Sequence, residues 1–420
     1  MNSIRLKKWY PWMVVGLLWI VALLNYMDRQ MLSTMRDAMA LDIRDLESKV
    51  LFGKVMAAFM WIYGFMSPIS GIVADRVNRK WLIVISLGVW STVTLLMGYA
   101  TSYNEVYWLR ALMGVSEALY IPAALSLIAD YFTGKQLSLA IGIHMTGLYM
   151  GQAVGGFGAF VAEQLSWQST FHCFGIIGII YALVLIIFLY EKRSRSEEIK
   201  VEEKLPLSVS IKNNMAAIRA SLGMLMTNVA FWTIIFFFAS CSVPGWATKN
   251  WLPTLFADSL NVEMSIAGPI ATITIAFASF IGVMIGGPMA DNWSRKNLKG
   301  RIFTSSIGLT LMIPSLVFMG FGTTFAAAIG AGVLFGLGYG LFDANNMPIL
   351  CQFVSDRSRG TAYGMMNMSG LFIGALATNV LGSLAEKGMM GLGFACMAGA
   401  LCLALILQLA VLKPKTLNME

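Results

Sequence analysis

Residues 71–80 read Gly-Ile-Val-Ala-Asp-Arg-Val-Asn-Arg-Lys, and residues 287–296 read Gly-Pro-Met-Ala-Asp-Asn-Trp-Ser-Arg-Lys. The glycine, aspartate, last arginine and lysine of the first segment each recur 216 positions later in the second. A weaker match relates Asp130-Tyr-Phe-Thr-Gly134 to Asp356-Arg-Ser-Arg-Gly360. This internal repeat predicts a chain built from two related halves.

The composition indicates that both halves lie in a membrane. Apolar residues make up 57% of the 420 residues and charged residues only 12%, which is too little charge to cover the surface of a soluble domain. Apolar runs of the roughly 20 residues needed to span a bilayer recur along the chain. The expected spans are 9–36, 50–74, 81–101, 104–131, 136–163, 168–191, 226–257, 264–291, 302–321, 324–351, 358–384 and 389–412. The predicted fold is all-α and integral to the membrane, with twelve transmembrane helices in two pseudo-symmetric six-helix bundles.

The net charge of +8 is a signal of topology rather than of nucleic-acid binding. Most lysines and arginines fall at the N-terminus, in alternate loops and in the tail, which twelve spans place on one side. We therefore expect a multi-pass protein of the cell membrane, the inner membrane in a bacterium, with both termini cytoplasmic. The basic residues concerned are Arg5, Lys7, Lys8, Arg76, Arg79, Lys80, Lys135, Lys192, Arg193, Arg195, Lys200, Lys204, Lys212, Arg219, Arg295, Lys296, Lys299, Arg301, Arg357, Arg359, Lys413 and Lys415.

A polar stretch over 191–220, rich in Lys, Glu, Arg and Ser, separates six expected helices from the other six. We predict an N-terminal bundle at 1–190, a cytoplasmic linker at 191–222 and a C-terminal bundle at 223–420. Glycines at four-residue spacing, such as Gly147, Gly151 and Gly155, allow close packing of helices in lipid. They suit either static packing or a sliding contact between the bundles.

Enzymatic chemistry has little support in the sequence. The chain has two histidines, His144 and His172, no zinc-type ligand spacing and no Walker lysine motif, so neither a metal nor another cofactor is expected. Two six-helix halves of this kind are typical of secondary transporters. A sensor on the same scaffold is an open alternative, because a sequence does not show turnover.

The segment 71–80 matches the pattern Gly-x-x-x-Asp-Arg-x-x-Arg-Arg/Lys, and with twelve helices the whole chain resembles the major facilitator superfamily. Within it, Asn25-Tyr26-Met27-Asp28-Arg29, Asn250-Trp251-Leu252-Pro253-Thr254 and the pair Arg110 and Glu117 resemble the anion:cation symporter family. Members of that family import hexuronates, aldonates, sialic acid and related organic anions. The resemblance implies proton-coupled symport of such an anion by a monomer, by alternating access. Sodium is the alternative coupling ion.

A second resemblance favours a different cargo. The segments 75–80 and 114–118 are also similar to spinster-type lipid transporters, which makes export of a lipid-like or amphipathic compound the main rival. The chain departs from both patterns, since Ser116 stands where a glycine is usual before the glutamate, and Asn292 replaces the arginine of the second half.

Ionisable residues at membrane depth are costly, by roughly 2.5–3.5 kcal/mol each, and they mark candidate sites. Arg29 suits a substrate carboxylate, with Asp28 as a protonatable partner, although a helix-end pair facing water is an alternative. Arg110 and Glu117 are seven residues apart, so both can face one interior surface. Glu117 is the predicted proton carrier, and a purely structural network is the other interpretation.

Further polar residues complete the predicted site. His144 is a third candidate for proton coupling, or else an ordinary hydrogen-bonded interior residue. Asp343 and its neighbouring asparagines interrupt an apolar span, which favours a cavity lining. Lys249 is expected to reach water near the outer end of the seventh helix. The predicted substrate contacts are Arg29, Arg110, Tyr63, Tyr149, Gln152, Asp343, Asn346 and Asn367, with Tyr63 favoured by the symporter resemblance.

The repeated segments predict a conformational gate on the basic side. Aspartates at the C-terminal ends of helices need a compensating partner, which nearby arginines or a helix N-terminus of the other bundle can supply. In the superfamily this cluster is thought to hold the bundles together when the cavity faces outward. The residues predicted to gate are Gly71, Asp75, Arg76, Arg79, Asp291 and Arg295.

Overall fold

The computed structural model describes residues 9–74, 77–132, 134–191, 223, 225–354 and 359–414, and every regular element among them is a helix. The elements of the first half are α2 (Tyr10–Ala40), η1 (Arg44–Glu47), α3 (Lys49–Ala74), α4 (Arg79–Met97), α5 (Tyr103–Ala118), α6 (Tyr120–Tyr131), α7 (Gly134–Gly155), α8 (Gly158–Leu165) and α9 (Trp167–Phe188). Those of the second half are α12 (Val229–Leu260), α13 (Met264–Ser294), α14 (Gly300–Phe321), α15 (Phe325–Asp343), α16 (Asn346–Cys351), α17 (Arg359–Glu386) and α18 (Met390–Val411).

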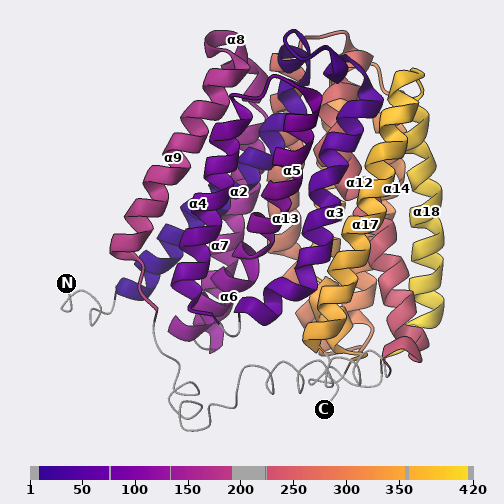
Figure 1. Cartoon of the computed structure of the whole chain (residues 1–420). Coiled ribbons are helices and arrows are strands. Elements are labelled where there is room, and N and C mark those ends of the chain that lie inside the picture. Colours follow the sequence, from indigo (N-terminus) through magenta and orange to yellow (C-terminus); the bar gives the residue numbers. More distant parts are fainter. Residues whose placement is uncertain are drawn as a thin grey trace.

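Eleven spans of the described chain are long and apolar enough to cross a membrane, and two of them join α5 with α6 and α15 with α16. The expected span at 136–163 corresponds to α7 and α8, which are not among the eleven. α7 carries glycine, histidine, threonine and glutamine among its apolar residues, and three of its glycines pack against α2, whereas Leu139, Met150 and Val154 are exposed. It nevertheless runs alongside the others from α6 at one end to α8 at the other (Figure 1). The predicted membrane fold is confirmed.

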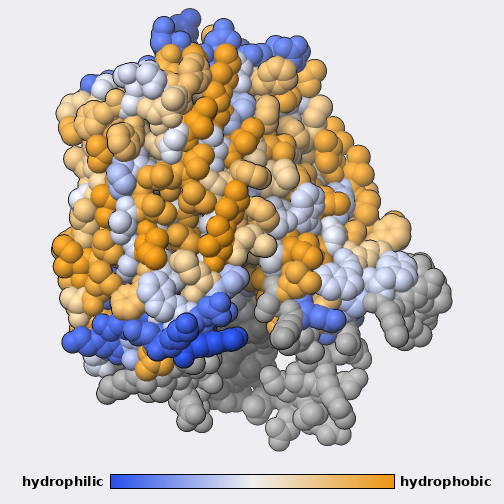
Figure 2. All heavy atoms as spheres, turned by 180° about the vertical axis from the view of Figure 1, so that it is seen from behind, coloured by the Kyte–Doolittle hydropathy of each residue, from blue (hydrophilic) through white to orange (hydrophobic). Residues whose placement is uncertain are grey.

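The helices run antiparallel in sequence, so alternate connections lie at the same end of the bundle (Figure 1). One end, the basic face, holds the first residue of α2, the last residue of α18 and the side chains Arg79, Lys80, Arg295, Lys296, Lys299, Arg301 and Lys413. The opposite end, the η1 face, holds η1 and α8. Hydrophilic side chains gather at the two ends, and a largely apolar surface separates them, as a bilayer requires (Figure 2).

Two helix pairs make the main contacts between the halves, α3 with α17 and α7 with α13. Near the η1 face these contacts are backbone to backbone. A Cβ on Gly382 would lie 2.7 Å from the carbonyl oxygen of Lys49, and one on Gly268 would lie 2.5 Å from that of Gly156. The boundaries 1–190, 191–222 and 223–420 stay a prediction, since almost all of the linker lies outside the described residues.

The four-residue glycine stripes pack within the halves rather than between them. Cβ atoms on Gly147, Gly151 and Gly155 would lie 2.6, 2.2 and 2.7 Å from carbonyl oxygens of α2. Gly282 approaches Leu337 of α15 in the same manner, at 2.4 Å. The interpretation of these stripes as a sliding contact between bundles is therefore wrong, and close static packing explains them.

Two glycines of α7 offer a matched test of this packing. We expect Gly151→Ala to destabilise the protein by about 1–3 kcal/mol, because the new methyl group would overlap the backbone of α2. Gly142→Ala, on the same helix, meets no atom within 4 Å and should leave stability unchanged. Thermal unfolding of both purified variants in one detergent measures the difference. Equal melting temperatures would contradict the packing described.

Candidate functional site

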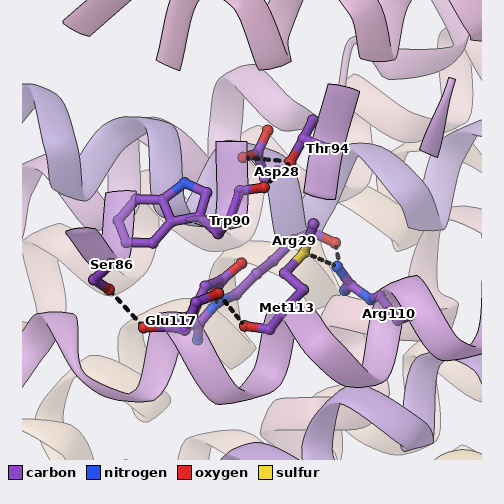
Figure 3. Close-up of polar contacts among 9 residues, drawn as sticks. Asp28, Arg29, Ser86, Trp90, Thr94, Arg110, Met113 and Glu117 are labelled. Carbon is purple, nitrogen blue, oxygen red and sulfur yellow. Dashed lines mark hydrogen bonds and ion pairs between the residues drawn. The ribbon is translucent and has the colours of Figure 1, made fainter. Parts of the chain in front are cut away.

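Arg29 of α2 and Glu117 of α5 form an ion pair inside the first half (Figure 3). The guanidinium Nε donates to the carboxylate Oε2 at 2.5 Å, with the Glu117 side chain fully buried and that of Arg29 only 9% exposed. Each charge compensates the other in a medium where a single charge would be costly. The second carboxylate oxygen, Oε1, and the Nη2 of Arg29 have no hydrogen-bond partner in the described chain, so the oxygen can accept a proton and the Nη2 can donate to a ligand.

Arg110 lies beside this pair without completing a second one. Its Nη2 donates to the backbone oxygen of Arg29 at 3.5 Å and its Nη1 contacts the sulfur of Met113 at 3.1 Å. Its guanidinium carbon lies 4.7 Å from the centre of the Phe59 ring, a favourable cation–π arrangement. No carboxylate oxygen of the described residues lies within 4.0 Å of it. The prediction that Arg110 and Glu117 face one interior region is confirmed.

Asp28 points away from Arg29, as adjacent residues on a helix do. Its Oδ2 accepts a hydrogen bond from Thr94 of α4 at 3.2 Å, and the residue is only 5% exposed (Figure 3). The expectation that Asp28 and Arg29 need not pair is confirmed, and the alternative of a water-facing pair at a helix end is wrong. A role for Asp28 in proton coupling stays a prediction.

A narrow cavity lies between the two halves next to Arg29 and Arg110, and its free space of about 20 Å³ holds about one water molecule. A larger ligand would need the halves to move apart here. The lining residues come from both halves and are Tyr26, Arg29, Gln30, Met56, Phe59, Met60, Arg110, Gln152, Trp246, Lys249 and Asn250.

Lys249 is the charged residue of the cavity lining that sequence reasoning missed. Its ammonium lies 4.9 Å from the ring centre of Trp246 and 5.7 Å from those of Tyr26 and Tyr339. The expectation that it reaches water at the helix end is wrong, because α12 continues for eleven more residues to Leu260, about 16 Å at 1.5 Å per residue. The apolar residues that follow Lys249 in the sequence indicated that the helix continues beyond it.

Asp343 ends α15 and contacts the other half. It accepts a hydrogen bond from the Tyr149 hydroxyl of α7 at 3.4 Å and one from the Asn346 amide at 3.3 Å. Asp343 is exposed, whereas Asn346 is buried with an unpartnered Oδ1. Asp343 also lies within electrostatic reach of Lys249. Neither Asp343 nor Asn346 is among the residues that line the cavity, so their role as substrate contacts stays a prediction.

The other predicted contacts lie at different distances from the cavity. Gln152 lines it, and the Tyr63 ring centre lies 4.7 Å from the Arg29 guanidinium. Asn367 instead donates to Ser67 across the α17–α3 contact at 2.7 Å. His144 lies apart from the cavity, fully buried, with its Nε2 2.9 Å from the Tyr120 hydroxyl, as the interior interpretation expects.

The predicted gate residues pair within their own halves. Arg79 forms an ion pair with Asp130, and Asp291 forms one with Arg301 at 3.2 Å. Arg295 lines a second, open hollow on the basic face, near the end of α13. A Cβ on Gly71 would meet no atom within 4 Å. Asp75 and Arg76 lie outside the described residues.

The η1 face, in contrast, is closed by contacts between the halves. The Lys49 ammonium pairs with Asp258 at 2.7 Å, and the Lys49 backbone N–H donates to Glu386 at 2.7 Å. Deeper in the bundle, the Gln30 amide donates to the backbone oxygen of Lys249 at 2.8 Å. The cavity is therefore sealed from this side by polar contacts of α2 and α3 with α12 and α17.

The described residues around the cavity offer no metal site. No group of three or more His, Cys, Asp or Glu side chains that could hold a metal ion occurs in the part of the chain that the structure describes. The polar atoms around the cavity are instead cations, amides and hydroxyls. These groups can bind an anion and the hydroxyls attached to it.

Comparisons with known proteins agree with this fold. The family model described as Major Facilitator Superfamily matches residues 18–378. The hexuronate transporter of Bacillus subtilis is 25% identical, and the match covers 95% of this chain and 93% of that transporter. Protein spinster homolog 1 of Xenopus laevis is 26% identical, and the match covers 72% of this chain and 59% of that protein. A bacterial homologue of the human lysosomal transporter Spinster, solved in an inward-facing, occupied conformation, superposes with a TM-score of 0.74 at 18% identity, covering 96% of this chain and 97% of that one.

The Arg29–Glu117 pair makes a prediction about stability. Removing one partner of a buried pair typically costs about 3–5 kcal/mol, whereas replacing both by apolar residues is often neutral. We therefore expect Glu117→Gln to lower the melting temperature, and Arg29→Met combined with Glu117→Met to recover it. Thermal unfolding followed by tryptophan fluorescence measures all three proteins.

A control separates buried from exposed charge. Glu163 of α8 is exposed, so Glu163→Gln should change stability little. A double variant that melts no higher than Glu117→Gln would show that the two charges are not energetically coupled.

Proposed function

The chain belongs to the major facilitator superfamily, and from this premise we propose that it is a secondary active transporter of a small organic anion. One observation carries the proposal. Arg110 and Lys249 face one cavity from opposite halves, and neither has a carboxylate of the described residues within 4.0 Å. Two such cations, at a depth where charge is costly, are best compensated by an anionic ligand.

The proposed substrate is a sugar acid such as a hexuronate, an aldonate or sialic acid. Its carboxylate would bind the Arg110 guanidinium and the Lys249 ammonium, with Arg29 nearby. The substrate hydroxyls would form hydrogen bonds with Gln152, Tyr149, Asp343 and Asn346. The aromatic rings of the cavity lining would pack against the carbon chain of the substrate. The hexuronate transporter of Bacillus subtilis, similar over nearly the whole chain, supports this substrate class.

Export of a lipid-like compound is the second candidate, favoured by the likeness to spinster homolog 1. The cavity lining weighs against it, because three cations of the lining would have to be desolvated beside an acyl chain. A lysolipid would also need a long apolar channel. Sugar acids fit the lining better.

Proton coupling is proposed to run through Glu117, with Asp28 as a second carboxyl in the same half. When both are ionised, their two negative charges equal the two positive charges of Arg29 and Arg110, although only Arg29 forms an ion pair. Protonating one of them frees positive charge to receive an anion, whereas an empty carrier that stays protonated keeps an unpaired positive charge, which is disfavoured in an occluded state. The unpartnered Oε1 of Glu117 gives the proton a free acceptor. A sodium ion is the alternative coupling ion.

Alternating access would then expose the cavity to each side in turn. The contacts of Lys49 with Asp258 and Glu386 close the η1 face, and the ion pairs of the basic face described here stay within one half. These contacts favour a state open toward the basic face. The basic-face gate around Arg79, Asp291 and Arg295 is proposed to close in the opposite state, with that face cytoplasmic.

Uptake into proteoliposomes tests the function. With an imposed proton or sodium gradient, the wild-type protein should accumulate at least one of the labelled probes D-glucuronate, D-gluconate and sialic acid, and not lysophosphatidylcholine. Arg110→Gln and Lys249→Gln should each weaken uptake roughly 10- to 100-fold, since a hydrogen bond to a charged group contributes about 1.5–3 kcal/mol.

The matched control is Lys54→Gln, because Lys54 is an exposed lysine of α3 outside the cavity lining and should transport normally. Probe binding without accumulation would indicate a sensor instead of a transporter. Accumulation of the lysolipid alone would favour the exporter.

If Glu117 carries the proton, its substitution should affect accumulation driven by a pH gradient and leave substrate exchange intact. Glu117→Gln should still exchange external for internal substrate, because exchange requires no net proton movement. It should lose accumulation driven by a pH gradient. Counterflow and gradient-driven uptake in the same vesicles give both quantities, and retained counterflow shows that the variant is folded. Accumulation with unchanged dependence on the pH gradient would rule out Glu117 as the proton carrier.

A further inference from the structure

The second half carries its own pair of opposite charges beside the cavity, Lys249 of α12 and Asp343 at the end of α15. We propose that Asp343 is a second proton-binding site, which takes up a proton when an anion binds at Lys249 and releases it when the anion leaves. This inference rests on the proposed function, since it requires an anionic ligand. It adds a proton site in the C-terminal half to the carboxyls of the N-terminal half.

Asp343 is placed to exchange a proton with water. It is exposed although its neighbours Asn345 and Asn346 are 1% and 7% exposed. Its hydrogen bonds from Tyr149 and Asn346, at 3.4 and 3.3 Å, are long, so they stabilise a negative charge only weakly. Glu117, by comparison, is fully buried and has a 2.5 Å bond from Arg29. The two carboxyls thus differ in access and in compensation.

Lys249 links the charge of Asp343 to the contents of the cavity. Its ammonium lies among the rings of Trp246, Tyr26 and Tyr339, and Asp343 is the carboxylate that acts on it electrostatically. No ion pair within 4.0 Å joins them, so the ammonium keeps its capacity to bind a second anion. A ligand carboxylate at Lys249 would compete with Asp343 for the same positive charge.

Among the described residues that face Asp343, none other than Lys249 carries a positive charge that could compensate its carboxylate. Besides Lys249, these are tyrosines from three further helices and from α15 itself, namely Tyr26, Tyr149, Tyr339 and Tyr363. α13 and α14 pack along α15, and their charged residues, Asp291 and Arg301, pair with each other on the basic face. With an anion bound between Arg110 and Lys249, that ammonium would therefore face two carboxylates.

Proton uptake resolves this imbalance. A proton from water adds to a carboxylate oxygen of Asp343, no other covalent bond changes, and the ligand carboxylate keeps Lys249 as its counter-charge. The neutral acid can then donate a hydrogen bond to a ligand hydroxyl or to the Asn346 Oδ1, which has no partner in the described chain. When the anion departs, Asp343 returns its proton to water and again compensates Lys249.

Calorimetry of the purified full chain tests the inference with D-glucuronate as the probe. Titrations near pH 7 in buffers of different ionisation enthalpy give the number of protons taken up per anion bound. We expect Asp343→Asn to bind the probe at least as tightly as the wild type and to take up fewer protons, by as much as one per anion. Asp343→Glu should restore the uptake.

Asp45→Asn is the matched control, because Asp45 is exposed in η1, far from the cavity lining, and its loss should change neither quantity. Unchanged proton uptake in Asp343→Asn would overturn the inference while leaving the proposed function intact. Loss of probe binding in a folded Asp343→Asn would also overturn it, since the neutral side chain would then not be the binding form. A wild type that binds no organic anion would remove both proposals.

Discussion

The compensation of buried charge is the constraint on which the interior of this protein depends. Arg29 and Glu117 neutralise each other at 2.5 Å, and leaving either of them unpaired at that depth is costly. Arg110 and Lys249 lack a partner of this kind in the described chain and rely on aromatic rings and more distant carboxylates. The interior is thus balanced only partly by its own residues, and an anion from solution can complete the balance.

The contacts between the two halves differ between the η1 face and the cavity. Toward the η1 face, glycine backbones lie in contact and Lys49 joins α3 to α12 and α17, so little space is left. At the cavity the contacts are made by long side chains, and the Tyr26 ring is shared by the Arg29 guanidinium and the Lys249 ammonium, at 4.8 and 5.7 Å. Because such contacts reorganise more easily than packed backbones, a bound ligand can alter how the halves meet at the cavity.

The sequence predicted the fold and the charged residues of the first half. Apolar runs long enough to span a bilayer can only be helices, and the repeat at 71–80 and 287–296 implies two related halves. The spacing of Arg110 and Glu117 placed both on one interior surface, which the structure confirms. α7 shows the limit of composition, because the glycines that pack it against α2 and the polar residues between them make it less apolar than the other spans.

Only the tertiary structure decided which charges meet. Lys249 follows Arg29 by 220 positions in the chain, and no periodicity within one helix reveals that both contact the ring of Tyr26. His144, the third candidate for proton coupling, lies against Tyr120 and away from the cavity. Hydropathy and spacing act along single helices, so they determine the spans and their inward faces. The pairing of side chains from different helices depends on how the helices pack, and that is a property of the whole fold.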